Sequence, residues 1–177
     1  IGVPSSGRNS KFLNTIGMFV NTLALRNQPT GTKTFIQFAN EVKDNSINAI
    51  DNQNYPQQEL VKKINYRKSL FDVMFAYQSE DMTEITLGDK KAEVIPTPIN
   101  SSKCDLSFYV YPRENETVLM TEYCTDLFKQ ETINKLINAY NTILTQALNE
   151  NVLIKDINVL TTDENDKISS FNNTEYI

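Results

Sequence analysis

The segment Leu70–Tyr77 constrains the fold most, because it is apolar on both of its alternating faces. It reads Leu-Phe-Asp-Val-Met-Phe-Ala-Tyr, and only Asp72 interrupts the apolar pattern. A strand with two apolar faces has to be covered on both sides, so the pattern predicts a central strand of a sheet. Burying a carboxylate is costly unless it is paired, so we expect Asp72 to accept hydrogen bonds from the backbone or from a basic neighbour rather than to contact a substrate.

Further strands are predicted on either side of this segment. Ile16–Leu25 is a short apolar run bounded by polar residues, which is typical of a buried strand. Asp105–Tyr111 and Thr117–Cys124 flank the turn-forming segment Pro112–Glu116 and predict a hairpin. Weaker strand patterns occur at Glu84–Leu87, Ala92–Ile95 and Ile157–Leu160.

Helices are predicted between these strands. The clearest is Thr132–Leu148, and a second helix is predicted to begin at a cap formed by Thr32 or Thr34 and to end near Gln53. Pro56 suits the first turn of a short third helix. Strands that alternate with helices predict an α/β domain with one mixed β-sheet covered by helices. The apolar stripe of the clearest helix consists of Ile133, Leu136, Ile137, Tyr140, Ile143, Leu144 and Ala147.

The absence of histidine from all 177 residues limits the chemistry most strongly. It excludes Ser-His-Asp and Cys-His nucleophilic schemes, histidine acid–base catalysis and most zinc sites. Cys104 and Cys124 are too few for a disulfide framework and lack metal-ligand spacing, so we expect two free thiols in a reduced, cytoplasmic setting.

Charge and hydropathy disfavour two further classes of function. The net charge is −5 and the 17 basic residues are scattered along the chain, which disfavours binding to nucleic acid. No run approaches the ~20 apolar residues that a membrane-spanning helix needs, and no signal peptide is visible. The residue patterns by themselves therefore predict an α/β domain without indicating its function.

Four segments in colinear order resemble motifs of one enzyme family. Ile16–Thr22, followed by Arg26, is similar to Gly-x-Phe-Val-Asn-Thr with its trailing Arg. Asn52–Pro56 resembles Gln-Asp-Tyr-Pro, and Arg67–Phe75 resembles a shortened Arg-Asn-Pro-Leu-Phe-Asp-Val-Met-Phe. Lys103–Ser107 is similar to Lys-Phe-Asp-Leu-Ser. The set resembles the C-terminal lobe of a condensation domain from a nonribosomal peptide synthetase, a secondary-metabolite and antibiotic biosynthesis enzyme.

The resemblance also has departures and an extension. Asn54 stands where the family usually has Asp, Gln57 stands where it usually has Phe, and the proline of the third motif is missing. The tail Asn172–Tyr176 resembles the start of an adenylation domain. We therefore expect residues 1–165 to form the condensation lobe and residues 166–177 to form a linker toward an adenylation domain.

The resemblance implies a fold, a reaction and a set of partners. The fold is one chloramphenicol acetyltransferase-like lobe of a two-lobed, V-shaped domain, and the reaction joins two carrier-bound thioesters through a peptide bond. The catalytic motif His-His-x-x-x-Asp-Gly belongs to the N-terminal lobe, so this chain is expected to be inactive alone and to supply no catalytic residue. Its partners are that lobe, peptidyl or acyl carrier proteins and the adenylation domain; it binds no cofactor or metal directly, and phosphopantetheine is carried by the carrier proteins.

The resemblance also selects residues, each with a plainer alternative. Asn21 either holds the phosphopantetheine arm or the lobe junction, or caps the end of its strand. Arg8, after Gly7, either faces an acidic carrier protein or is a solvated charge on a surface turn, and Met18 is more often a core residue than a ligand contact. The residues predicted for the tunnel or lobe interface are Gly7, Arg8, Met18, Asn21 and Ser107. Those predicted to be structural polar residues are Arg26, in an ion pair, Asp72, and Lys103 with Asp105, which share one face of the strand and either pair with each other or line the lobe junction.

Two other functions stay open at this point. The chain is also compatible with a lobe of an epimerisation or cyclisation domain, since those differ mainly in motifs of the other lobe. A second alternative is a non-catalytic module that docks carrier proteins. Because a half-domain exposes an apolar face, we also expect weak self-association, which sedimentation would show as a mass that depends on concentration.

Overall fold

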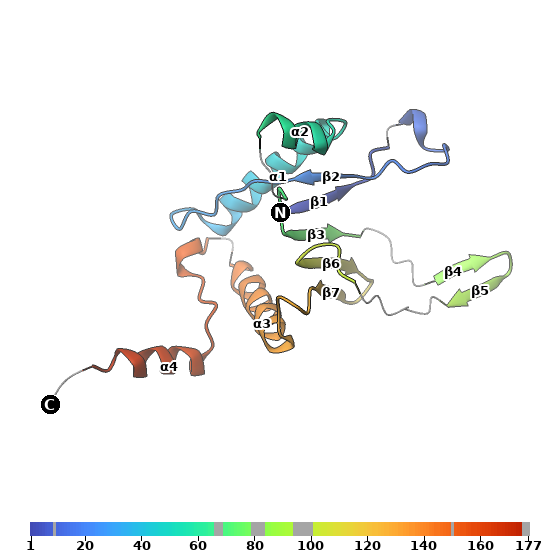
Figure 1. Cartoon of the computed structure of the whole chain (residues 1–177). Helices are drawn as coiled ribbons and strands as arrows, with labels where there is room; N and C mark the ends of the chain where they lie inside the picture. The colour runs from blue at the N-terminus through green and yellow to red at the C-terminus, as the bar shows by residue number, and fades with distance from the viewer. Residues whose placement is uncertain (9, 66–68, 79–83, 94–100, 150, 175–177) are drawn as a thin grey trace. The chain divides into compact units, whose positions relative to one another are not determined.

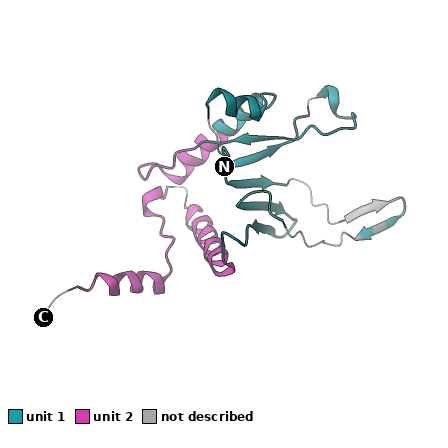
Figure 2. Cartoon of the chain, viewed as in Figure 1, with its two compact units in different colours: residues 1–26, 44–128 teal, residues 27–43, 129–177 magenta. Residues whose placement is uncertain are grey.

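The computed structural model of the chain describes all residues except 9, 66–68, 79–83, 94–100, 150 and 175–177. The chain forms two compact units (Figure 2). Unit 1 comprises residues 1–26 and 44–128, and unit 2 comprises residues 27–43 and 129–177. The predicted Arg67–Lys68 part of the third motif and the predicted strand residues Val94–Ile95 lie outside the described residues.

Unit 1 is built on a five-stranded mixed sheet with the order β2-β1-β3-β6-β7 (Figure 1). The predicted central strand is confirmed, because β3 is the middle strand and pairs in parallel with both β1 and β6. The predicted hairpin is confirmed as the antiparallel pair of β6 and β7. The strands are β1 (Gly2–Ser5), β2 (Asn21–Ala24), β3 (Val73–Tyr77), β6 (Leu106–Pro112) and β7 (Thr117–Tyr123).

The strand register divides the side chains of the sheet between two faces. Directly paired residues project to the same side, so Met74, Ser107 and Glu122 share one face, which we call the Ser107 face. Tyr109 lies two residues along β6 on that same face. Phe75, Phe108 and Thr121 lie on the opposite face, which we call the Thr121 face.

The predicted strand Ile16–Leu25 is wrong over its first half. Only Asn21–Ala24 pairs with β1, and Ile16 and Met18 are almost fully exposed. The partner strand β1 ends at Ser5, and Gly7 then turns with a φ of 62°, so residues 16–20 have no strand to pair with. They form part of a loop that also contains the short helix η1 (Ser10–Phe12), and Met18 is not a core residue.

Helix α1 (Phe35–Asp51) begins where the sequence predicts. The Thr34 hydroxyl accepts a hydrogen bond from the Gln37 amide at 3.2 Å, and the Gln37 side chain accepts one from the Thr34 amide at 2.9 Å. These reciprocal bonds form a capping box, which satisfies two donors that the helix start would otherwise leave unpaired. The short helix α2 (Gln57–Lys63) follows Pro56, which lies at its N-cap. Strands β4 (Glu84–Leu87) and β5 (Lys90–Glu93) form a separate two-stranded hairpin.

The turn between α1 and α2 is attached to the Thr121 face. The Ser5 hydroxyl donates to the side-chain oxygen of Gln53, and the side-chain amide of Asn21 donates to the backbone carbonyl of Gln53 at 2.6 Å. Ser5 pairs with Asn21 and projects opposite to Gly2, whose partner Met74 lies on the Ser107 face. These contacts therefore fix which side of the sheet this turn covers.

Unit 2 contains α3 (Gln130–Ala147), η2 (Ile154–Asp156) and α4 (Thr162–Asn172). Helix α3 confirms the clearest predicted helix, and its Ile133 is fully buried. The predicted strand Ile157–Leu160 is wrong, because the Gln146 side chain occupies the place of a neighbouring strand. Its amide donates to the Asn158 carbonyl at 2.7 Å and accepts from the Asn158 amide at 3.0 Å.

Helix α4 begins at a capping box formed by Thr161 and Glu164. The Glu164 carboxylate accepts from the Thr161 amide at 3.1 Å and lies 3.3 Å from the Lys135 ammonium of α3. The hydrogen bonds from Thr161 lower the pKa of Glu164, and Lys135 adds to this effect. The helix continues across the predicted boundary at residue 165, and that boundary stays a prediction.

The start of α4 should therefore depend on pH. The pKa of Glu164 is lower in the folded chain than in the unfolded one, so its stabilisation is present above the ordinary glutamate pKa of about 4.3 and is lost as the pH falls through the folded value. We expect faster amide exchange in the first turn of α4 as the pH drops below about 4, relative to intrinsic rates. Glu164→Gln should remove this pH dependence, and a profile identical to that of the native chain would contradict the assignment.

Candidate functional site

The Arg8 guanidinium organises the loop between β1 and β2. Its Nη1 donates to the carbonyl oxygens of Phe12 at 2.8 Å and Thr15 at 2.7 Å, and its Nη2 donates to that of Gly17 at 2.9 Å. Its Cζ lies 4.5 Å from the centre of the Phe19 ring, which stacks on Phe12. The charge thus holds the loop backbone and one aromatic face, which differs from a side chain that is merely solvated on a surface turn.

Gly7 is required by the same loop. A Cβ atom at this position would lie 1.9 Å from the carbonyl oxygen of Phe19, and the φ of 62° is one that other residues rarely adopt. The loop presents several apolar side chains to solvent. The exposed ones are Phe12, Leu13, Ile16, Met18 and Val20.

Asn21 lies at the first residue of β2 and is engaged within unit 1. Its amide group donates to Gln53, as described above, and its side-chain oxygen accepts from the Thr22 amide at 2.9 Å. Both polar ends are used, as the strand-end alternative expects. A role for Asn21 toward phosphopantetheine stays a prediction.

Ser107 is the most deeply buried of the predicted tunnel residues. It is 0% exposed, and its hydroxyl has no hydrogen-bond partner within the described part of the chain. The neighbouring Tyr109 phenol is close enough for the Ser107 hydroxyl to act on its pKa, but the two groups do not reach hydrogen-bond geometry. A buried hydroxyl without a partner is uncommon and marks a place where a further polar group would be favourable.

Carboxylates surround the end of the sheet at which β3 and β6 begin. Burial raises the pKa of the Cys104 thiol, and Asp105, Glu122 and Asp72 raise it further in that order, while Lys103 opposes them. Burial also raises the pKa of Tyr109, with Glu122 as the next cause. The sequence analysis does not select Glu122 or Tyr109 as site residues. A hairpin with its turn at Pro112–Glu116 nevertheless predicts that Glu122 lies opposite Ser107, on the same face as Tyr109.

The residues predicted to be structural differ in their surroundings. Asp72 is exposed and precedes β3, so the prediction that it is buried on the strand is wrong and it needs no buried partner. Its backbone carbonyl accepts from the Leu106 amide at 3.3 Å. Lys103 is exposed and Asp105 is half-buried. Among the described residues Lys103 and Asp105 form no ion pair with each other, and the exposed Arg26 forms none either.

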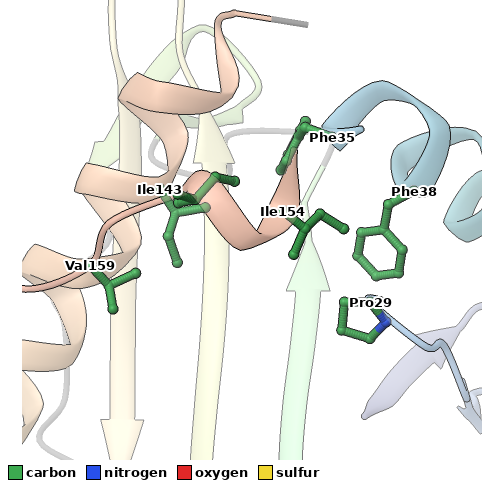
Figure 3. A pocket seen from close by; sticks show the side chains of 7 residues that line it. Pro29, Phe35, Phe38, Ile143, Ile154 and Val159 are labelled. Carbon is green, nitrogen blue, oxygen red and sulfur yellow. The ribbon is translucent and has the colours of Figure 1, made fainter. Parts of the chain in front are cut away.

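Unit 2 contains an apolar cavity of about 300 Å³ (Figure 3). Its lining carries no titratable side chain, so it offers no group for acid–base or nucleophilic chemistry. None of the predicted site residues borders it, although Ile143 belongs to the apolar stripe predicted for α3. The lining consists of Pro29, Phe35, Phe38, Ile143, Ile154, Ile157 and Val159.

Two classes of feature are missing from the described residues. They contain no group of three or more Cys, Asp or Glu side chains placed to hold a metal ion. The helices among them include none with the length and apolar character needed to cross a membrane.

The chain thus combines a mixed sheet with helices, and one face of the sheet carries a row of polar residues. Residues 1–169 match the family model described as condensation domain, so the chain belongs to the condensation domain family. It is 39% identical over 189 residues to tyrocidine synthase 2 of Brevibacillus parabrevis, and 39% identical over 171 residues to surfactin synthase subunit 2 of Bacillus subtilis. These alignments cover 98% and 93% of this chain but 5% of each relative.

Solved structures show the same fold. The starter condensation domain of rhizomide synthetase in complex with C8-CoA superposes with a TM-score of 0.77 at 18% identity. The X-domain from teicoplanin biosynthesis gives 0.75 at 19% identity. The chain is covered to 91% and 90%, but it spans only 38% and 39% of those chains, so it corresponds to part of a condensation domain structure.

Replacing Arg8 should loosen the loop even when the positive charge is kept. A lysine has no planar fork to reach three carbonyl oxygens while lying on the Phe19 ring, so Arg8→Lys and Arg8→Met should behave alike. Losing two or more hydrogen bonds should increase chymotrypsin cleavage within residues 12–20 by roughly tenfold. Arg113→Lys, in the β6–β7 turn, is the matched control, and an unchanged cleavage rate in Arg8→Lys would contradict the assignment.

The carboxylates near Cys104 should control its reactivity. Glu122→Gln removes one of the charges that raise the pKa of the thiol, so more thiolate should form at pH 8 and alkylation by iodoacetamide should become about twofold faster. The measurement uses a Cys124→Ser background so that only one thiol reacts. Glu114→Gln carries the same charge change in the β6–β7 turn and should have no effect. Equal rates for both variants would show that Glu122 lies too far from the thiol.

Proposed function

We propose that the chain is the C-terminal lobe of a peptide-bond-forming condensation domain and supplies one wall of the tunnel in which two carrier-bound thioesters meet. The observation that carries the proposal is the family match over residues 1–169, together with relatives that are peptide synthetases. The partial coverage of the condensation domain structures supports a single lobe.

The reaction requires an amine, a thioester and a base. The amine nitrogen of the acceptor aminoacyl group attacks the donor thioester carbonyl, a C–N bond forms, the C–S bond breaks, and the donor thiolate leaves and takes up a proton. The chain has no histidine, so a base of that kind comes from the other lobe. The contribution of this chain is positioning, since holding two reactants together removes much of the entropy cost of a bimolecular step.

The partners follow from this role. The proposed ones are the N-terminal lobe of the same domain, carrier proteins with covalently attached phosphopantetheine and an adjacent adenylation domain, all in the cytoplasm. Among the predicted tunnel residues, Ser107 lies on the sheet face opposite the α1–α2 turn, but it is fully buried, so the half-buried side chains beside it on that face would line the wall.

The alternatives are a lobe of an epimerisation or cyclisation domain and a docking module. The fold by itself does not separate an epimerisation or cyclisation lobe from a condensation lobe, because these domains are expected to differ mainly in motifs of the other lobe. The family model that matches residues 1–169, which is described as a condensation domain, favours peptide-bond formation over both alternatives.

The test uses the longer synthetase polypeptide that contains this chain, with both carrier domains loaded. We expect a dipeptide by mass spectrometry, and we expect Gly7→Ala to reduce it at least about tenfold without changing thioester loading, because the new Cβ would clash with the Phe19 carbonyl. Glu114→Gln should leave the yield unchanged. Fully loaded carriers that give no dipeptide would overturn the proposal and favour the docking module.

A further inference from the structure

Three polar side chains, those of Ser107, Tyr109 and Glu122, project from the Ser107 face. Ser107 is paired directly with Glu122 across β6 and β7, and Tyr109 lies two residues along β6 on the same face. Glu122 and Tyr109 are half-buried, whereas Ser107 is fully buried beside them. The group therefore has an accessible rim and a buried floor.

The floor of this group lacks a hydrogen-bond partner. The Ser107 hydroxyl exposes less than 1 Å² and makes no hydrogen bond to any described residue. Leaving a buried hydroxyl unpaired is unfavourable, and most buried side-chain polar atoms in folded proteins have at least one hydrogen-bond partner.

The rim of the group is negatively charged. The carboxylates of Asp105, Glu122 and Asp72 all raise the pKa of the Cys104 thiol, and the ammonium group of Lys103 lowers it. Within the described residues no ion pair neutralises Glu122. A partly buried surface with an excess of carboxylates attracts cations and hydrogen-bond donors.

We propose that Glu122, with the Ser107 hydroxyl behind it, binds the amino group of the acceptor aminoacyl thioester. The inference rests on the proposed function, which supplies the substrate class. A carboxylate accepts charge-assisted hydrogen bonds from an ammonium group, and a serine hydroxyl accepts one more. Glu122 is therefore a binding residue that selects acceptors with a free amine.

This binding has a consequence for the reaction. A carboxylate stabilises the protonated amine, but attack on the thioester requires the neutral amine, so the base has to remove a proton before the C–N bond forms. Glu122 therefore improves acceptor capture more than the chemical step. In the loaded synthetase, Glu122→Gln should raise the acceptor concentration needed for half-maximal rate while changing the maximal rate little.

The direct test compares two probes that differ only in the amino group. One is pantetheine carrying glycine through an amide in place of the thioester, and the other is the same molecule with an acetylated nitrogen. Binding to the 177-residue chain is followed by ¹⁵N NMR titration. We expect the free-amine probe to bind about tenfold more tightly, and Glu122→Gln to abolish that difference. Glu114→Gln, with the same charge change on the exposed turn, should preserve it.

A Ser107→Ala variant tests the floor separately. Because the hydroxyl has no partner, its removal should leave the thermal midpoint equal or higher while weakening the free-amine probe roughly threefold. Unchanged binding, or a clear loss of stability, would overturn the part assigned to Ser107.

The outcomes separate this inference from the proposed function. If the native chain binds both probes equally, or if Glu122→Gln keeps the preference for the amine, the assignment of Glu122 fails while the tunnel-wall role survives. If the native chain binds neither probe, both fail. A preference that is lost in Glu122→Gln and kept in Glu114→Gln supports the inference.

Discussion

The parallel pairing of β3 with β6 is the interaction on which the rest of unit 1 depends. It runs from Val73 opposite Leu106 to Tyr77 opposite Val110, and β1 and β7 are added on its two sides. Ala76, Leu106 and Val110, the most buried hydrophobic side chains of the described sheet, all come from these two strands. Parallel strands need a long connection, so this pairing brings together residues that local sequence cannot associate.

Elements with strong local patterns were predictable, and elements that depend on a distant partner were not. The central strand, the β6–β7 hairpin and α3 follow from apolar periodicity and turn residues within each segment. Ile16–Val20 and Ile157–Leu160 have equally apolar sequences. The first has no strand beside it, and in the second the Gln146 amide takes the hydrogen bonds that a strand would have used.

The same distinction applies to the candidate site. Ser107 was identified from its motif, but its missing hydrogen-bond partner is a property of the packed sheet. The position of Glu122 opposite Ser107 follows from the predicted hairpin, but the burial of these two side chains depends on the packed sheet. The sequence shows that Arg8 is charged, but not that it donates hydrogen bonds to three carbonyl oxygens. Those bonds depend on the path of a loop whose sequence has no periodic pattern.

The two hydrogen bonds between the Gln146 side chain and the Asn158 backbone also make this segment sensitive to slow chemical modification. Deamidation would convert Gln146 to glutamate and replace its N–H donor with an oxygen that faces the Asn158 carbonyl across the present 2.7 Å contact. Two acceptors repel each other at that distance, so the segment after η2 would be released from α3. Deamidation of one side chain would then change the local structure after η2 without any cleavage or unfolding of the chain.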